Sequence, residues 1–250
     1  MTVMHCLTTN PQPQNDRFTG LLRARGIGVT QLPLHAYGPP SAGGAALRQV
    51  LREAQADAFD WLLFSSPQAV AAVVAEATLF PNAAQYGAVG EATAAALRAA
   101  GVEPAVVANG GGEALATAVL QHGLTASTRI ASFQAEAGRT EWHTVLTAHG
   151  ATLRHVPAYR LLPSPVDAAA WCAAHPDPIH AIPFTAPSAV QRFVELFSPF
   201  LAASPFATAR YYAIGRTTAT ALTVAQLPIA AVASSQAFSA LVAVIEHENS

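Results

Sequence analysis

The chain has 250 residues, a net charge of −2, and 52% hydrophobic but only 11% charged residues, which predicts compact domains rather than disorder. All 13 basic residues are arginine, and this balance gives no indication of a nucleic-acid partner, whose binding sites need a basic surface. The absence of lysine also excludes a P-loop, a Schiff-base enzyme and a kinase-type lysine.

The beginning of the chain, MTVMHCLTTN, has neither the basic segment nor the apolar run of a signal peptide. Residues 217–245 carry no formal charge, but Gln226, Pro228 and the polar residues 234–236 interrupt them, so no membrane span is expected. The two cysteines form no CxxC motif and the nine histidines are scattered, so neither a disulfide nor a metal site is expected. We therefore expect a soluble cytoplasmic protein without a metal.

Short apolar runs alternate along the chain with longer alanine-rich segments that have helical patterns. Five of these runs, bounded by Gly, Pro or Ser, are WLLFS (61–65), YGAV (86–89), PAVVA (104–108), RIASF (129–133) and TLRHV (152–156). Runs that are apolar on both sides are typical of buried parallel strands, and the segments between them of crossover helices. Pro67 and Pro187 suit the first turn of a helix. The pattern predicts an α/β fold with doubly wound parallel sheets.

Three segments of the chain occur twice, at offsets of 120 to 125 residues. The matched pairs are 60–75 with 180–195, 86–101 with 211–226, and 129–157 with 5–33. In the last pair, Trp142 stands in the place of Phe18 and Leu146 in the place of Leu22. The repetition indicates two copies of one α/β unit.

The order of the copies predicts two similar flavodoxin-like domains. One copy is continuous, at residues 38–158, whereas the other is divided between residues 1–35 and 163–250. The continuous copy is therefore inserted into the divided one. Two proline-containing crossings, at 34–41 and 158–165, are expected to join the domains as a two-stranded linker.

The duplicated loops are the candidate ligand site, because doubly wound sheets bind ligands beyond the carboxyl ends of their strands. Glycine allows a tight turn there, and Ser or Thr adds a hydroxyl near the first helical N–H groups. The same residue types also serve as ordinary helix caps and turns, and the residue pattern leaves both interpretations open. The candidate residues are Ser65, Ser66, Gly90, Thr93, Thr185, Ala186, Ser188, Gly215 and Thr218.

Other motifs give no catalytic signature. The chain contains no GxSxG and no HExxH. The glycines at 110–112, and Gly26 with Gly28, do not complete GxGxxG and are interpreted as turns. From residue patterns alone, the chain is a two-domain ligand-binding protein.

Five segments resemble the uroporphyrinogen-III synthase family, and together they extend over nearly the whole chain. They are DWLLFSSPQAV (60–70), VGEATAAAL (89–97), VPAYR (156–160), FTAPSAV (184–190) and AIGRTTATAL (213–222). The resemblance implies two α/β domains on a two-stranded linker and a lyase that needs no cofactor. Its substrate would be hydroxymethylbilane, a linear tetrapyrrole with eight carboxylates, closed to uroporphyrinogen III with inversion of ring D. We expect a monomer with no nucleic-acid or membrane partner.

The resemblance also implies roles for single residues. Tyr159 matches a family tyrosine that is proposed to assist departure of the substrate hydroxyl group, although packing at the hinge is an alternative. Arg139 lies where the family often has arginine. Thr93 and Thr218 match family threonines that face the cleft. Loops containing Ser65 and Ser66, and Thr185 to Ser188, match family loops beside the substrate.

Two positions depart from the family pattern. Asn10 stands where the family commonly has the arginine of Thr-Arg-Pro, and Ala186 replaces a serine. Because these changes remove an arginine and a hydroxyl group from the expected site, a tetrapyrrole-binding sensor without turnover is the alternative function.

Overall fold

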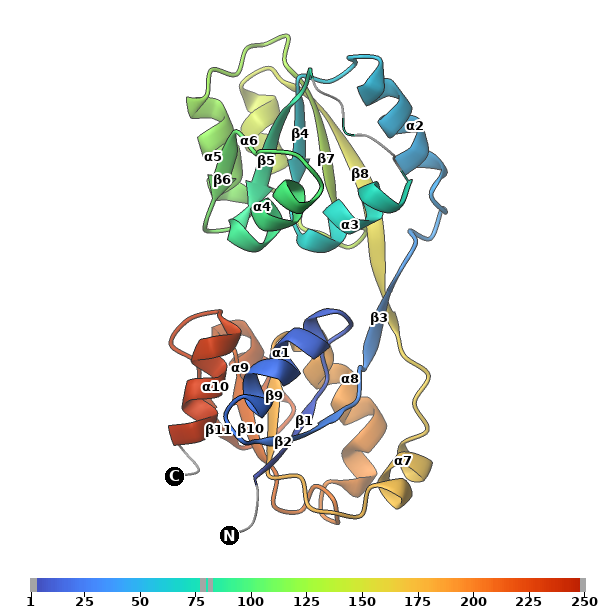
Figure 1. The fold of residues 1–250 in the computed structure, drawn as a ribbon, viewed down its shortest axis with the longest axis vertical. Coiled ribbons are helices and arrows are strands. Elements are labelled where there is room, and N and C mark those ends of the chain that lie inside the picture. The colour runs from blue at the N-terminus through green and yellow to red at the C-terminus, as the bar shows by residue number, and fades with distance from the viewer. Residues whose placement is uncertain (1–3, 77–79, 81–82, 248–250) are drawn as a thin grey trace. The chain divides into compact units, whose positions relative to one another are not determined.

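The computed structural model describes residues 4–76, 80 and 83–247 (Figure 1). The chain divides into two compact units, one comprising Met1–Ala36 with Leu162–Ser250 and the other Tyr37–Leu161. These divisions fall at the two crossings where the sequence predicts domain boundaries. No helix in the described ranges has both the length and the apolar character needed to cross a membrane.

The unit built from both chain ends contains a five-stranded sheet in the order β2-β1-β9-β10-β11, and neighbouring strands run parallel. This is the flavodoxin-like order, and the direction of strand progression reverses between β1 and β9. The strands are β1 (His5–Thr8), β2 (Gly28–Gln31), β9 (Ala181–Phe184), β10 (Arg210–Ala213) and β11 (Ile229–Val232). The helices are α1 (Gln14–Arg23), α7 (Ala168–Ala174), α8 (Pro187–Phe197), α9 (Arg216–Val224) and α10 (Phe238–His247), with a 3₁₀ turn at Ser198–Phe200.

The inserted unit contains the strand order β8-β7-β4-β5-β6, with β3 added beside β8. Its five principal strands are again parallel, and their order reverses between β7 and β4. The strands are β3 (His35–Gly38), β4 (Trp61–Phe64), β5 (Gln85–Val89), β6 (Val106–Ala108), β7 (Arg129–Ala135) and β8 (Thr152–Pro163). The helices are α2 (Ala45–Gln55), α3 (Pro67–Glu76), α4 (Gly90–Ala99), α5 (Gly112–Gln121) and α6 (His143–Ala148).

Both faces of each sheet are covered by helices, as Figure 1 shows for the inserted unit. The sequence of strand β4 is apolar throughout because both faces of the strand are buried. Leu62 and Phe64 belong to the hydrophobic cluster that contains α3, whereas Trp61 and Leu63 belong to the cluster that contains α5. Successive side chains of a strand point to opposite faces, so a strand buried on both faces has no polar position. The predicted α/β fold with parallel sheets is confirmed.

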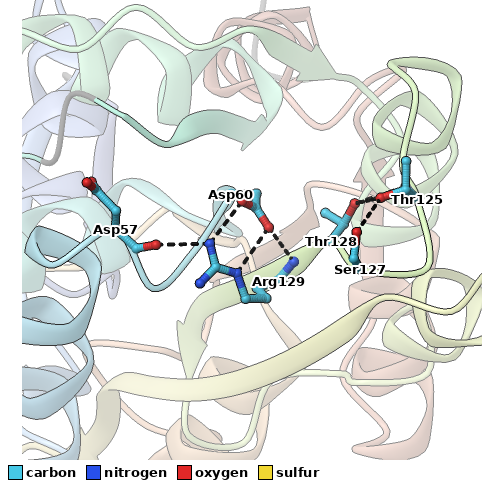
Figure 2. A network of polar contacts seen from close by, with 6 residues as sticks. All are labelled: Asp57, Asp60, Thr125, Ser127, Thr128 and Arg129. Carbon is cyan, nitrogen blue, oxygen red and sulfur yellow. Dashed lines mark hydrogen bonds and ion pairs between the residues drawn. The ribbon is translucent and has the colours of Figure 1, made fainter.

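Each unit has an equivalent internal contact at the amino ends of its strands. At the start of β7 the Arg129 backbone N–H donates to Asp60 Oδ2 at 2.7 Å, and the guanidinium group also binds this carboxylate (Figure 2). These hydrogen bonds hold the pKa of Asp60 below its usual value. At the duplicated positions, the His5 backbone N–H donates to His180 Nδ1 at 3.1 Å. The duplication thus preserves the contact while the side-chain chemistry differs.

A second equivalent contact occurs inside each unit. It joins the first strand of the duplicated segment to the helix that follows it. Thr8 Oγ1 lies 3.3 Å from Thr19 Oγ1, and Ser132 Oγ lies 3.1 Å from His143 Nε2. Both pairs are buried, and the two pairs are related by the offset of 124 residues. The three-dimensional contacts therefore support the alignment of residues 5–33 with 129–157.

Candidate functional site

A pocket of about 480 Å³ lies at the carboxyl ends of the strands in the inserted unit. This volume is within the usual range for small-molecule sites, and the edge is the one at which doubly wound sheets bind ligands. The pocket brings together four of the predicted site residues, Ser65, Ser66, Arg139 and Tyr159. Its other lining residues are Val89, Gly110, Gly111, Gly112, Glu113, Gln134, Ala135, Gly138, Glu141 and Trp142.

Tyr159 and Ser66 form the polar pair of this pocket. Tyr159 Oη lies 3.0 Å from Ser66 Oγ, and the Ala69 backbone N–H donates to the same Ser66 oxygen at 3.2 Å. Ser66 therefore caps α3 with its oxygen, while its hydroxyl proton stays available for Tyr159. When Ser66 donates to the phenol oxygen, the phenol proton is free to be given to a ligand.

The surroundings of Tyr159 keep it protonated. Burial raises its pKa, and the hydrogen bond with Ser66 offsets part of that rise. The Tyr37 ring packs edge-to-face against it with centroids 5.4 Å apart, and burial together with Tyr159 raises the pKa of Tyr37 to about 12. A neutral phenol can donate a proton to a leaving oxygen, so Tyr159 has the protonation state needed for a general acid.

An irregularity in strand pairing sets the position of Tyr159. Gln134 pairs with Pro157, but Ala135 pairs with Tyr159, so that the β8 strand has one extra residue at this point. The Glu136 backbone N–H then donates to the Tyr159 carbonyl at 2.7 Å. Bulges of this kind re-aim the side chains that follow them and recur beside active sites. Here the bulge places Tyr159 opposite Ala135 instead of Glu136.

The start of α5 forms another wall of the pocket. Gly110 and Gly111 have φ values of 123° and 86°, which side chains rarely allow, and no side chain caps the helix. A Cβ at Gly112 would come within 2.4 Å of the Trp142 ring. The first N–H groups of α5 therefore border the pocket without a side-chain partner, an arrangement that favours anions. The residue pattern predicted only a turn at these glycines, although three consecutive glycines after a strand were a usable signal for this wall of the pocket.

Thr93 and Gly90 lie beside the pocket but do not line it. Thr93 is buried, and its hydroxyl donates to the Val89 carbonyl at 2.7 Å. Gly90 has a φ of 75° at the start of α4. In the structure both residues shape the loop that carries Val89 to the pocket wall.

In the other unit, the predicted residues fall into two groups. The Thr185 hydroxyl donates to Asn10 Oδ1, which connects the loops after β9 and β1. Ala186 is the N-cap of α8 and has no side-chain capping bond, and Ser188 lies in the first turn of that helix. This group sits where the strand order of the sheet reverses.

The second group lies at the β10 and β11 ends of the same sheet. Gly215 lines a pocket of about 460 Å³ together with Arg216 and the loop at 234–236. Its backbone is extended, with a φ of −177°, so this position does not need glycine for conformational reasons. Thr218 is buried in α9 and does not line the pocket.

No group of three or more His, Cys, Asp or Glu side chains that could hold a metal occurs in the part of the chain that the structure describes. The polar groups of the site are instead hydroxyls, amides, backbone N–H groups, the exposed Arg139 and the exposed carboxylates of Glu113 and Glu141. Such a set can bind acidic groups and supply one phenolic proton.

Comparisons with known proteins agree on one family. The model of the family described as uroporphyrinogen-III synthase HemD matches residues 16–243. A uroporphyrinogen-III synthase of Synechococcus elongatus is 31% identical over 201 residues, which cover 77% of this chain and 74% of the relative.

Two solved structures show the same fold. The uroporphyrinogen-III synthetase of Helicobacter pylori has a TM-score of 0.64 at 18% identity, covering 98% of this chain and 99% of its own. A mutant uroporphyrinogen III synthase of Thermus thermophilus has a TM-score of 0.61 at 20% identity, covering 99% of both chains.

Proposed function

Because this chain belongs to the uroporphyrinogen-III synthase family, we propose that it converts hydroxymethylbilane to uroporphyrinogen III. The observation that carries the proposal is the family match over residues 16–243, which includes both units. The reaction loses water from the hydroxymethyl group on ring A and closes the macrocycle with ring D inverted, through a spiro intermediate. The enzyme would thus be a lyase, and we propose that it acts as a cytoplasmic monomer without a cofactor.

The proposed reaction needs little chemical assistance from the protein. Ring closure without inversion proceeds in water unaided, so the protein's main task is to hold one conformation of the substrate while water leaves. Holding reacting groups in place can supply several kcal/mol of a barrier, about 7–11 kcal/mol in well-oriented intramolecular reactions. A pocket with several fixed hydrogen-bond donors suits this role.

Tyr159 is the residue that we propose to assist the departing hydroxyl group. It lines the pocket as a neutral phenol, and Ser66 is positioned to donate to its oxygen. As the carbon–oxygen bond on ring A breaks, the phenol would give its proton to the leaving oxygen and water would depart. The hydrogen bond from Ser66 would stabilise the phenolate that this transfer leaves behind.

A non-catalytic tetrapyrrole sensor is the other function considered, and no feature of the pocket favours it over the enzyme. The test is to supply freshly prepared hydroxymethylbilane and separate the type III and type I products. We expect mostly type III, formed faster than spontaneous closure. If only type I forms, at the spontaneous rate, the synthase proposal is wrong and a binding protein remains.

A further inference from the structure

Two buried carboxamide side chains have amide nitrogens without a hydrogen-bond partner. Gln134, at the carboxyl end of β7, is 2% exposed, and its Nε2 is unpaired. Asn10, two residues beyond β1, is 3% exposed, and its Nδ2 is unpaired. Buried polar groups in native proteins are almost always paired, so two such exceptions call for a physical reason.

The two carboxamides occupy equivalent places in the duplicated units. Gln134 follows Asn10 by the same offset of 124 residues that relates the buried pairs Thr8–Thr19 and Ser132–His143. Strands β1 and β7 each lie at the point where the strand order of their sheet reverses. This is where doubly wound folds bind ligands.

The residues that flank the two carboxamides in the sequence differ between the units. Asn10 lies between Thr9 and Pro11, whereas the matching positions beside Gln134 are Phe133 and Ala135. What both units retain is an amide donor at this edge of the sheet.

Gln134 faces the pocket of the inserted unit. It lines that pocket together with the N-terminus of α5 and with Tyr159. The turn after β7 leaves room for the amide, because a Cβ at Gly138 would come within 3.1 Å of Gln134 Cδ. The unpaired nitrogen therefore belongs to a residue that lines the pocket, with further donors around it.

Asn10 is oriented by a neighbouring loop in the other unit. Its Oδ1 accepts the Thr185 hydroxyl, which identifies the remaining amide atom as a donor. Thr9 Oγ1, Gln14 Oε1 and Asn15 Oδ1 are also buried without a hydrogen-bond partner. These unpaired polar atoms all belong to the segment 9–15 that follows β1.

We propose that the amide N–H group of Gln134 in its unit, and that of Asn10 in its own, each donate a hydrogen bond to a carboxylate of a tetrapyrrole. The identity of this ligand rests on the proposed function. An N–H group requires an acceptor, and carboxylates are the acceptors that this class of substrate carries in abundance. Hydrogen bonds to a charged acceptor are stronger than neutral ones, so a neutral amide can hold a carboxylate without a buried cation.

The test compares variants for binding of uroporphyrinogen III, measured without oxygen by calorimetry, and for the melting temperature of the free protein. Gln134→Met keeps the length of the side chain but removes the donor. We expect affinity to fall about 10- to 100-fold. The free protein should melt at a higher temperature, since an unpaired buried polar group is gone. A residue that merely packs in the core would not show this opposition between binding and stability.

Two acidic variants extend the test. Gln134→Glu and Asn10→Asp replace the donor with a carboxylate of the same shape, and Asn10→Asp keeps the oxygen that Thr185 binds. Both should weaken binding at least as much as Gln134→Met, because like charges then face each other. The control is Gln85→Glu, which makes the same chemical change at an exposed residue at the amino end of β5 and should bind normally.

The results separate this inference from the proposed function. If the wild type makes type III product and Gln134→Met and Asn10→Asp bind as it does, the carboxamides are not ligand donors and only this inference is overturned. If the wild type binds uroporphyrinogen III through these amides but gives no type III product, the inference holds and the enzyme assignment fails. If the wild type does not bind it at all, both are wrong.

Discussion

The Tyr159 hydroxyl is the group on which the proposed chemistry depends most. It is half-buried, lines the pocket and contacts a serine whose oxygen already caps a helix. Its alternative role is to pack against the Tyr37 ring, a contact that does not involve the hydroxyl. Removal of the Tyr159 hydroxyl group would impair catalysis in the first role but would leave the packing contact of the second role intact.

Tyr159→Phe should lower kcat for type III product about 100-fold, the lower end of the effect of a general acid, and change product affinity only a few-fold. Steady-state kinetics with separated isomers would measure the first, and anaerobic calorimetry the second. Tyr37→Phe is the control, because Tyr37 touches the Tyr159 ring without lining the pocket. An unchanged kcat for Tyr159→Phe would show that Tyr159 is a packing residue and not a general acid.

The duplicated glycines are predicted to differ in their tolerance of substitution. Gly90 has a φ of 75°, a conformation that costs a residue with a side chain about 1–2 kcal/mol, whereas Gly215 is extended. A Cβ at Gly215 would meet only the Gln236 side chain, at 3.5 Å. We expect Gly90→Ala to lower the free energy of unfolding by about 1–2 kcal/mol, and Gly215→Ala by less than about 0.5 kcal/mol. Urea denaturation of the two variants tests this, and equal losses would contradict it.

At the scale of helices and strands, the buried pair between β7 and α6 makes the inserted unit sensitive to acid. Burial, and then the neighbouring His155, lower the pKa of His143 to about 4. In the unfolded chain this histidine titrates near its ordinary value of 6.5. As pH falls below 6.5 the unfolded state takes up the proton first, so the folded state loses stability between about pH 6.5 and pH 4.

This histidine should account for a loss of about 3 kcal/mol between pH 7 and pH 4, at about 1.4 kcal/mol for each pKa unit. His143→Gln, which can still reach Ser132, should remove most of that pH dependence. His149→Gln, at an exposed histidine just after α6, should leave it intact. Denaturant unfolding across this pH range measures the difference, and identical slopes for the two variants would show that His143 is not responsible.

Much of the arrangement of elements could be predicted from the sequence, because strands buried on both faces are continuous apolar runs. WLLFS and RIASF became β4 and β7, and Pro67 and Pro187 begin α3 and α8. Strand β8 extends far beyond the predicted run at 152–156, up to Pro163. A bulge just after Pro157 and the end of the strand at Pro163 accommodate the two prolines in this strand.

The site was only partly predictable, because its lining converges from strands that are distant in sequence. Ser65, Ser66, Arg139 and Tyr159 were found through duplicated loops and family resemblance, and the structure brings them to one pocket. Gln134 and Trp142 were missed as site residues. Residues that face a pocket and residues in the core can each interrupt or end an ordinary apolar run. The local spacing of Gln134 and Trp142 therefore does not show which of the two kinds they are.

At the scale of the whole molecule, the insertion of one unit into the other predicts that each can fold alone. Two hydrophobic clusters consist of residues from 37–161, and two of residues from the rest of the chain. The ends of the outer unit are adjacent, because the Ser164 backbone N–H donates to the Leu34 carbonyl at 2.9 Å. A short Gly-Ser linker can therefore replace the inserted unit.

A fragment of residues 35–163, and a chain in which a linker replaces residues 37–161, should each show a cooperative thermal transition by circular dichroism. Neither should form uroporphyrinogen III, although each should keep its share of the binding groups. A fragment 35–163 that stays unfolded would show that the inserted unit depends on the other for its stability.

The proposed tetrapyrrole site lies at the carboxyl edge of the parallel sheets, and amide hydrogen exchange with uroporphyrinogen III can locate it. In the inserted unit, binding should slow exchange in the loops at 65–66, 110–113 and 134–142 that surround the pocket. The network of Asp57, Asp60 and Arg129 at the amino edge (Figure 2) should exchange as in the free protein. Protection confined to the amino edge, or absent from all three pocket loops while the product is bound, would contradict the account.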